Sequence, residues 1–368
     1  MRIVQVANFV SPTSGGLRTT LRHLAEGYAG QGHEVVQVLP GERDAETGTP
    51  WGRQVFLRSA TLPGTGYRLL LEPARVRAAL ARLAPDALEV HDRTTLRGLG
   101  RWAQRSGVPS LVVSHERTDR WLEQWLSPRL PLQAWADRAN ANLARDFDRV
   151  VCTTAWAAEE FRRLAVPHLV TIPLGMDHLQ FAPRLGARRA PGAPVQLVMV
   201  CRLSKEKRPD LAVEAVRELC RRGVDVHLVV AGDGAMQCGL AELGRGLPIR
   251  WCGFVADRAE LAGLLSDADI ALAPGPVETF GLAALEALAC GTPVVVNFHS
   301  ALPEVVGPDA GRAAASSGFV FADAVQELLD LPEAGRRAAA RARAEQFSWS
   351  STVEGFLAVH RQRQRVPA

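Results

Sequence analysis

The sequence predicts an α/β protein with two domains, each built on a doubly wound parallel sheet. Three observations support this prediction. Short apolar runs of strand length alternate with longer amphipathic runs of helix length along the chain. The alternation stops between residues 181 and 194, where Pro, Gly, Ala and Arg gather without an apolar period, and then resumes. A length of 368 residues, 47% of them hydrophobic and 22% charged, suits two soluble domains of ordinary size.

The first domain is expected to cover residues 1–180. It begins with a strand over 3–9 and a helix over 17–30. We interpret the next apolar runs as strands at 34–39, 54–59, 86–91, 110–115, 149–154 and 169–174. Runs with a helical period lie at 67–83, 94–106 and 121–145. This βαβ rhythm indicates a Rossmann-like domain with a parallel sheet.

The second domain is expected to cover residues 181–347 and to have the same architecture. Its strands are predicted at 195–201, 226–232, 249–255, 269–274 and 293–297, and its helices at 208–222, 256–266, 279–290, 322–329 and 333–347. A last helix over about 348–364 is expected to pack back onto the first domain. Because parallel sheets bind ligands at the carboxyl ends of their strands, two such sheets facing each other would form one cleft.

Composition excludes several classes of protein. The formal charge of +4 and the pI of about 8.9 are too mildly basic to indicate nucleic-acid binding, but they suit a phosphate ligand or an anionic membrane surface. None of the six cysteines forms a C-x-x-C pair, and most lie in apolar runs, so we interpret them as small core residues. The chain starts without a signal peptide and has no stretch of about 18 apolar residues, so we expect a cytoplasmic protein.

The strongest motif is a pair of acids in residues 278–286, ETFGLAALE, followed by ALACGTPVV. Glu278 follows a predicted strand, and Phe280, Gly281 and Leu282 open a helix whose free N–H groups can bind hydroxyl or phosphate oxygens. Glu286 lies inside that apolar helix, where a merely solvated acid is unexpected. Carboxylates accept hydrogen bonds from sugar and ribose hydroxyls. The motif therefore indicates binding of a sugar-bearing, phosphate-bearing ligand.

A basic loop, residues 202–208, follows the strand at 195–201 and precedes a helix. Cations such as Arg202 and Lys207 are unfavourable at a helix N-terminus unless an anion binds there, and a diphosphate would suit them. An ordinary solvated basic loop is the other reading.

Weaker candidates end other strands. Gly15 and Gly16 after the first strand would let a backbone approach a phosphate. His115 ends the strand at 110–115 and is either a cleft residue or a structural histidine. The remaining candidates could frame a base and its ribose or could be simple turns; they are Gly232, Asp233, Phe254 and Val255. The G-x-G-x-x-G fingerprint of dehydrogenases is absent here.

Together these residues resemble the family-4 retaining glycosyltransferases of the GT-B fold. The Gly-Gly loop, the strand-end His, R-x-x-x-x-K, G-D-G, E-x7-E and G-T-P-V-V appear in the family's order nearly from end to end. Within the family the chain resembles the actinobacterial GDP-mannose-dependent α-mannosyltransferases, through VQVANF, SGGLRTTL, SHERTDR and VVCTTAW. Thr279 stands where the family commonly has Gly.

The resemblance implies a role for each candidate. Arg202 and Lys207 would neutralise the donor diphosphate, with Gly16 against the phosphates. Glu286 would hold the ribose. Glu278 would hold the transferred sugar, helped by backbone at 280–282, and His115 would lie against the sugar's 6-hydroxyl.

The chemistry follows from these parts. Fixed cations and helix-start amides can stabilise the leaving diphosphate without a metal ion or another cofactor. The D-x-D at 267–269 lies between a helix and a strand, so we interpret it as helix termination. We expect retention by same-face attack, in which the leaving phosphate takes the acceptor proton, because both acids look like hydroxyl binders rather than the carboxylate pair of a hydrolase.

Partners follow from residues of the first domain. Trp121, Trp125 and Trp135 lie near Arg117 and Arg120 in one stretch, as suits peripheral contact with the inner face of the plasma membrane and a glycolipid or mannoside acceptor. Alternatively, this stretch is a helix on the sheet with a solvated basic face.

Other functions remain open. A UDP-sugar-dependent transferase, an epimerase or a phosphorylase could share the fold, and a nucleotide-sugar sensor could share the binding residues. An epimerase would turn over the donor without acceptor, and a phosphorylase would carry pyridoxal phosphate. A sensor would bind the donor without hydrolysing it.

Overall fold

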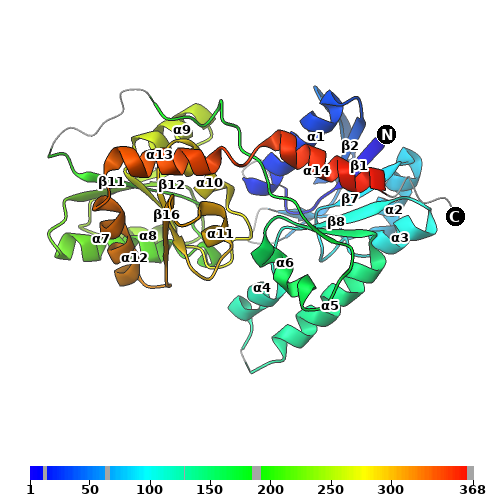
Figure 1. Cartoon of the computed structure of the whole chain (residues 1–368). Helices are drawn as coiled ribbons and strands as arrows, with labels where there is room; N and C mark the ends of the chain where they lie inside the picture. The colour runs from blue at the N-terminus through cyan, green and yellow to red at the C-terminus, as the bar shows by residue number, and fades with distance from the viewer. Residues whose placement is uncertain (11–14, 63–66, 128, 185–191, 363–368) are drawn as a thin grey trace. The chain divides into compact units, whose positions relative to one another are not determined.

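The computed structural model describes residues 1–10, 15–62, 67–127, 129–184 and 192–362. The chain divides into two compact units (Figure 1). The first is Met1–Gly175 together with Trp349–Ala368, and the second is Met176–Ser348. The division thus falls near the predicted boundaries at residues 180 and 347. Within the described residues, no helix combines the length and the hydropathy needed to cross a membrane.

The first unit is built on an eight-stranded sheet in the order β10-β9-β8-β7-β1-β2-β4-β3. Its strands are β1 Arg2–Val6, β2 Glu34–Gly41, β3 Ala45–Thr49, β4 Gly52–Arg58, β7 Ala87–Val90, β8 Ser110–Ser114, β9 Arg149–Cys152 and β10 Leu169–Thr171. All neighbours are parallel except β3 and β4. The chain builds outward from β1 in one direction and from β7 in the other, so the topological switch point lies between these two strands.

Helices cover both faces of this sheet because successive strand residues point to opposite sides. On one face, Ile3 and Val35 pack under α1 Gly16–Gly30 and α14 Trp349–Gln362. On the other face, Val4 and Leu88 pack against the remaining large helices. These helices are α2 Pro73–Leu83, α3 Leu99–Arg105, α5 Leu132–Asp146 and α6 Ala155–Arg162. In Figure 1 the last helix, α14, lies beside α1 at the start of the chain.

Several element predictions for this unit were wrong. The predicted helix at 121–145 is two helices, α4 Thr118–Trp125 and α5, because Pro131 cannot donate a backbone hydrogen bond and serves as the N-cap of α5. The predicted helix at 67–83 begins only at Pro73, after a short hairpin of β5 Ala60–Thr61 and β6 Arg68–Leu69. Helix α6 was missed; its N-cap Thr154, whose hydroxyl accepts from Ala157 N at 3.0 Å, had been assigned to a strand.

The second unit is built on a six-stranded parallel sheet in the order β13-β12-β11-β14-β15-β16. Its strands are β11 Val195–Val200, β12 Val226–Ala231, β13 Ile249–Gly253, β14 Ile270–Ala273, β15 Val294–Asn297 and β16 Gly311–Ala314. Its helices are α7 Pro209–Arg221, α8 Gln237–Leu243, α9 Arg258–Asp267, α10 Leu282–Ala289, α11 Leu302–Val306, α12 Gly318–Leu329 and α13 Glu333–Ala344. Leu197 and Leu228 of the sheet pack with α7 and α12 in one core.

Sequence patterns located the long elements of this unit better than the short ones. Strand β16 and helices α8 and α11 were missed because segments of four to seven residues carry too little periodicity. The predicted helix at 279–290 begins later, at Leu282, since Gly281 before it has a φ of 77°. The predicted helix at 322–329 begins earlier, at Gly318. The D-x-D at 267–269 spans the end of α9 and the approach to β14.

Candidate functional site

The switch point of the second sheet lies between β11 and β14, which are neighbours in space although far apart in the chain. The loop after β11 carries Arg202 and Lys207, and the loop after β14 carries Glu278. The two loops meet: Lys207 Nζ and Glu278 Oε1 form an ion pair, and both side chains are about a quarter exposed. Three of the predicted site residues are therefore brought to one sheet edge.

The basic loop is not a group of unpaired cations. Arg202 Nη2 lies 3.2 Å from Glu206 Oε1, and its side chain is half exposed. Burial lowers the pKa of Lys207, but the Glu278 carboxylate outweighs burial and raises the pKa above its usual value. Lys207 is therefore a fixed positive charge at neutral pH, as a group that binds a diphosphate must be.

The first turn of α10 follows directly after Glu278. Gly281 is the N-cap, and a Cβ there would lie 2.2 Å from Leu302 Cδ2, so the sharp entry into the helix requires glycine. Phe280 is buried, and its ring contacts Phe347 edge-on with centroids 5.9 Å apart. Gly281 and Leu282 are half-buried, so the start of the helix remains accessible to a ligand.

Glu286 lies in the second turn of α10 and is only 6% exposed. Its Oε1 is 2.9 Å from Arg258 Nη2, and the Arg258 guanidinium lies 4.6 Å from the centre of the Phe181 ring. Burial raises the pKa of Glu286, and Arg258 opposes that rise. Arg258 was missed by sequence reasoning; its position at the start of α9, just after Phe254 and Val255, was the available signal.

The ends of β12 and β13 adjoin the same loops. Gly232 has a φ of 155°, and a Cβ there would lie 1.8 Å from the carbonyl oxygen of Cys201. Leu203 N donates to Asp233 O at 2.9 Å, which ties the end of β12 to the basic loop. Phe254 is half exposed and Val255 half-buried at the end of β13. All the candidates of this unit thus derive from one edge of the sheet or from α10.

The first unit carries the other predicted residues. Gly15 is exposed and is the N-cap of α1, which begins at Gly16; Ser14 lies outside the described residues. His115 follows β8, and its Nε2 lies 2.9 Å from His91 Nδ1 with the two rings stacked. Burial, and then the charge of His91, lowers the pKa of His115 to about 3. His115 is therefore neutral at physiological pH.

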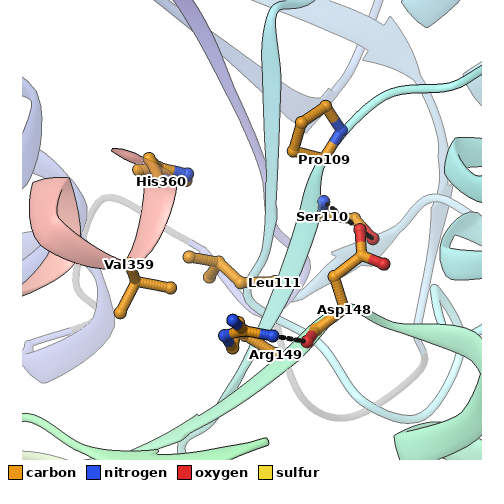
Figure 2. A pocket seen from close by; sticks show the side chains of 7 residues that line it. All are labelled: Pro109, Ser110, Leu111, Asp148, Arg149, Val359 and His360. Atoms are coloured by element: carbon orange, nitrogen blue, oxygen red, sulfur yellow. Dashed lines mark hydrogen bonds between the residues drawn. The ribbon is translucent and has the colours of Figure 1, made fainter. Parts of the chain in front are cut away.

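A hollow in the first unit lies away from these residues (Figure 2). Ser110 and Arg149 of its lining begin β8 and β9, whereas His115 follows the opposite end of β8. The other lining residues are Pro109, Leu111, Asp148, Val359 and His360. Because ligands of such sheets bind at the carboxyl ends of strands, this hollow is not the candidate site.

The chain matches two family models, "Glycosyl transferase 4-like domain" over residues 15–175 and "Glycosyl transferases group 1" over residues 187–345. It is 47% identical over 367 residues to a GDP-mannose-dependent alpha-(1-6)-phosphatidylinositol dimannoside mannosyltransferase of Mycobacterium tuberculosis, covering 97% of this chain and 95% of the relative. A glycogen synthase of the same species is 30% identical over 409 residues, covering 100% of this chain and 97% of that protein.

Two solved structures share the fold. Sucrose-phosphate synthase of Thermosynechococcus elongatus superposes with a TM-score of 0.81 at 21% identity, over 99% of each chain. HepE of Anabaena in complex with UDP gives a TM-score of 0.74 at 18% identity, over 98% of this chain and 100% of that one. The predicted α/β class with parallel sheets and the motif-based resemblance are both confirmed, and the chain belongs to the group 1 glycosyltransferases of the GT-B fold.

Proposed function

We propose that this glycosyltransferase transfers mannose from GDP-mannose, with retention and without a metal ion, to a mannoside or glycolipid acceptor. The observation that carries the proposal is the meeting of Lys207 and Glu278 at the switch point of the second sheet, a cation and a carboxylate from two strand ends. The choice of GDP-mannose is supported by the 47% identical relative, whose name includes that donor.

The proposed roles follow from charge and hydrogen-bonding capacity. As the bond from the sugar to the diphosphate breaks, negative charge grows on the phosphate oxygens. Lys207 and Arg202 would stabilise that charge together with the N–H groups at the start of α10. Glu278 accepts only, so it suits a sugar hydroxyl, and Glu286 suits the ribose hydroxyls.

The remaining assignments are proposals of the same kind. Gly232 and Asp233, with Phe254 and Val255, would line the nucleoside. Gly15 and Gly16 would contact the phosphates, and His115 would contact the 6-hydroxyl of the sugar.

Retention is proposed to proceed by same-face transfer. The bond from the anomeric carbon to the diphosphate oxygen breaks, and a bond from that carbon to the acceptor oxygen forms on the same face. The proton of the acceptor hydroxyl moves to an oxygen of the leaving diphosphate. Because Lys207 and the α10 amides supply fixed positive potential, no divalent cation is required in this scheme.

The acceptor is proposed to be reached at a membrane surface. Trp121, Trp125 and Trp135 of α4 and α5 are each about half exposed, and Leu126 between the helices is 38% exposed. Tryptophan side chains favour the boundary between headgroups and acyl chains, where a glycolipid presents its sugar. The exposed Arg129 in the same segment would attract anionic headgroups.

The donor is tested by thermal shift with GDP-mannose, UDP-glucose and ADP-glucose, since a ligand that binds the native state raises the melting temperature. We expect a response to GDP-mannose that Lys207→Met abolishes and that Lys205→Met, a change at an exposed neighbour, preserves. A response to UDP-glucose alone overturns the donor. Donor conversion to an epimer without acceptor overturns the reaction type.

Mechanism and acceptor need separate tests. NMR of the product should show the α-anomer, and chelation by EDTA should leave the rate unchanged; a β-product or a metal requirement contradicts the scheme. In co-sedimentation with phosphatidylinositol vesicles, Trp121→Ser and Trp125→Ser should weaken binding. Leu179→Ser, a change at a 97% exposed residue of the other unit, should not. Equal sedimentation of all three variants would contradict the membrane contact.

A further inference from the structure

A row of polar side chains crosses the otherwise apolar sheet of the first unit. Gln54, Gln37, Gln5 and Glu89 belong to β4, β2, β1 and β7, and each is in register with the next. Their side chains are hydrogen-bonded in sequence: Gln54 donates to Gln37 at 3.0 Å, Gln37 to Gln5 at 2.9 Å, and Gln5 to Glu89 at 2.8 Å. Burial of so many polar groups costs stability unless they are paired, so the row calls for a functional account.

The row ends at Glu89, whose side chain is fully buried. Its Oε1 accepts from the Tyr28 hydroxyl at 2.6 Å and from His360 Nε2 of α14 at 2.7 Å. Its Oε2 accepts from Gln5 and lies 3.4 Å from His91 Nε2. Burial alone would raise the pKa of Glu89, but the hydrogen bonds from His360 and His91 outweigh burial and hold it well below its usual value. Glu89 is therefore an ionised carboxylate, which can only accept hydrogen bonds.

The state of Glu89 determines the protons on the next two rings. Because Glu89 accepts, His91 carries its proton on Nε2, and a neutral His91 then has a lone pair on Nδ1. That lone pair faces His115 Nε2 at 2.9 Å, so His115 Nε2 must be the donor. With its proton on Nε2, neutral His115 has an Nδ1 that can only accept.

The backbone around His115 is held by a second buried group. Arg93 Nη1 donates to the Ser114 hydroxyl at 2.6 Å and to the Glu116 carbonyl at 2.7 Å, one residue on either side of His115. The Arg93 guanidinium also pairs with the buried Glu160. The position of His115 is thus fixed through its backbone neighbours, and its ring is fixed through His91.

We propose that Glu89 and His91 are positioning residues that fix His115 with its proton on Nε2, so that Nδ1 accepts a hydrogen bond from a hydroxyl of the transferred sugar. The proposal rests on the proposed function, because it gives His115 a sugar hydroxyl as its partner. Its acceptor character distinguishes it from a protonated histidine, which would donate to the sugar's oxygen atoms instead.

The test begins with a measurement that needs neither donor nor acceptor. In protein labelled with 15N-histidine, long-range 1H–15N spectra report which ring nitrogen carries the proton, and a spectrum of His115→Gln assigns the His115 signals. We expect the Nε2–H form for His115 in the unaltered chain. An Nδ1–H form, or a His91 that is doubly protonated, overturns the proposal whatever the donor proves to be.

Glu89→Gln then reverses the relay without changing the shape of the side chain. The new amide donates to His91 Nε2, His91 donates from Nδ1, and His115 must accept at Nε2 and carry its proton on Nδ1. We expect kcat for mannosyl transfer to fall about 10- to 100-fold, as when the group that orients a functional histidine is lost, with KM for the donor changed by less than about threefold.

Tyr28→Phe is the matched control because it removes one hydrogen bond to the same carboxylate but leaves the ion and its contact with His91. We expect it to lower the melting temperature and to preserve both kcat and the His115 tautomer. Equal kcat in Glu89→Gln and Tyr28→Phe overturns the proposal. Loss of transfer in the unaltered chain would contradict the proposed function instead, and the tautomer result would still stand.

Discussion

The ion pair between Arg258 and Glu286 allows a sharp test of how the candidate donor site is stabilised. The Glu286 carboxylate side chain is 8% exposed, and Arg258 Nη2 lies 2.9 Å from it. In Arg258→Met, the aliphatic stem that packs near Phe181 is largely kept, but the cation is lost. Glu286 is then a buried carboxylate without that partner, which the structure must either solvate or protonate.

The expected loss of stability follows from the exposure of the two groups. Removing one partner of a fully buried pair costs about 3–5 kcal/mol, because it leaves an uncompensated buried charge. Arg258 is 37% exposed in its side chain, so water already screens the pair. We therefore expect Arg258→Met to lower the free energy of unfolding by roughly 1–3 kcal/mol at neutral pH.

The loss should depend on pH with a defined sign. The pKa of Glu286 is already above its usual value of 4.5 because of burial, and removal of Arg258 raises it further. Between 4.5 and the raised pKa, the folded state binds more protons than the unfolded state, so the free energy of unfolding decreases as pH rises. The penalty of Arg258→Met should therefore be larger at pH 8 than at pH 5.

The assay is urea unfolding followed by circular dichroism at both pH values, with hydrogen exchange of α10 peptides as a local readout. Arg258→Met combined with Glu286→Gln should regain most of the lost stability, because no charge is then left buried. Arg250→Met, on an exposed side chain of β13, is the matched control and should change little. An unchanged midpoint for Arg258→Met at pH 8, or a double variant no better than the single one, would refute this reasoning.

Three further predictions concern other contacts. Lys207→Met should lower kcat/KM for mannosyl transfer about 10²- to 10³-fold, as does losing a group that stabilises developing negative charge, while Lys207→Arg should retain more of the rate in a radiolabel transfer assay. Comparable rates for the two variants would argue against a charge role. Gly232→Ala should lower the free energy of unfolding by at least about 1–3 kcal/mol, because its Cβ would overlap the Cys201 carbonyl, whereas Gly239→Ala in α8 has open space around it and should be neutral or stabilising. The check is the urea midpoint, and similar midpoints for both glycine variants would be inconsistent with the contact. His115 has a pKa lowered from 6.5 to about 3, so the unfolded state takes up a proton that the folded state refuses, and stability should fall as pH drops from about 6.5 towards 3, by at most about 5 kcal/mol. His115→Gln should flatten the stability profile between pH 6.5 and 5, and an unaltered slope would contradict this assignment.

Much of the fold could be predicted from local pattern. Apolar runs such as those of β11 and β12 are continuous because strands buried on both faces have no solvent side, and the helices between them have a clear apolar face. The E-x7-E motif and the R-x-x-x-x-K motif located Glu278, Glu286, Arg202 and Lys207 without any structure. Short or proline-interrupted elements escaped prediction, as at Pro131, because a few residues carry no reliable period.

By itself, therefore, the sequence determined the α/β class, the two domains' strand and helix rhythm and the family to which the chain belongs, because these depend on local residue order. Tertiary structure alone decided which distant residues meet. Lys207 reaches Glu278 because the sheet places β11 beside β14, and Glu89 reaches His91 and His115 because β7 lies between β1 and β8. Such pairs depend on strand order and register, and the free energy that selects an order is spread over a whole core rather than over any motif.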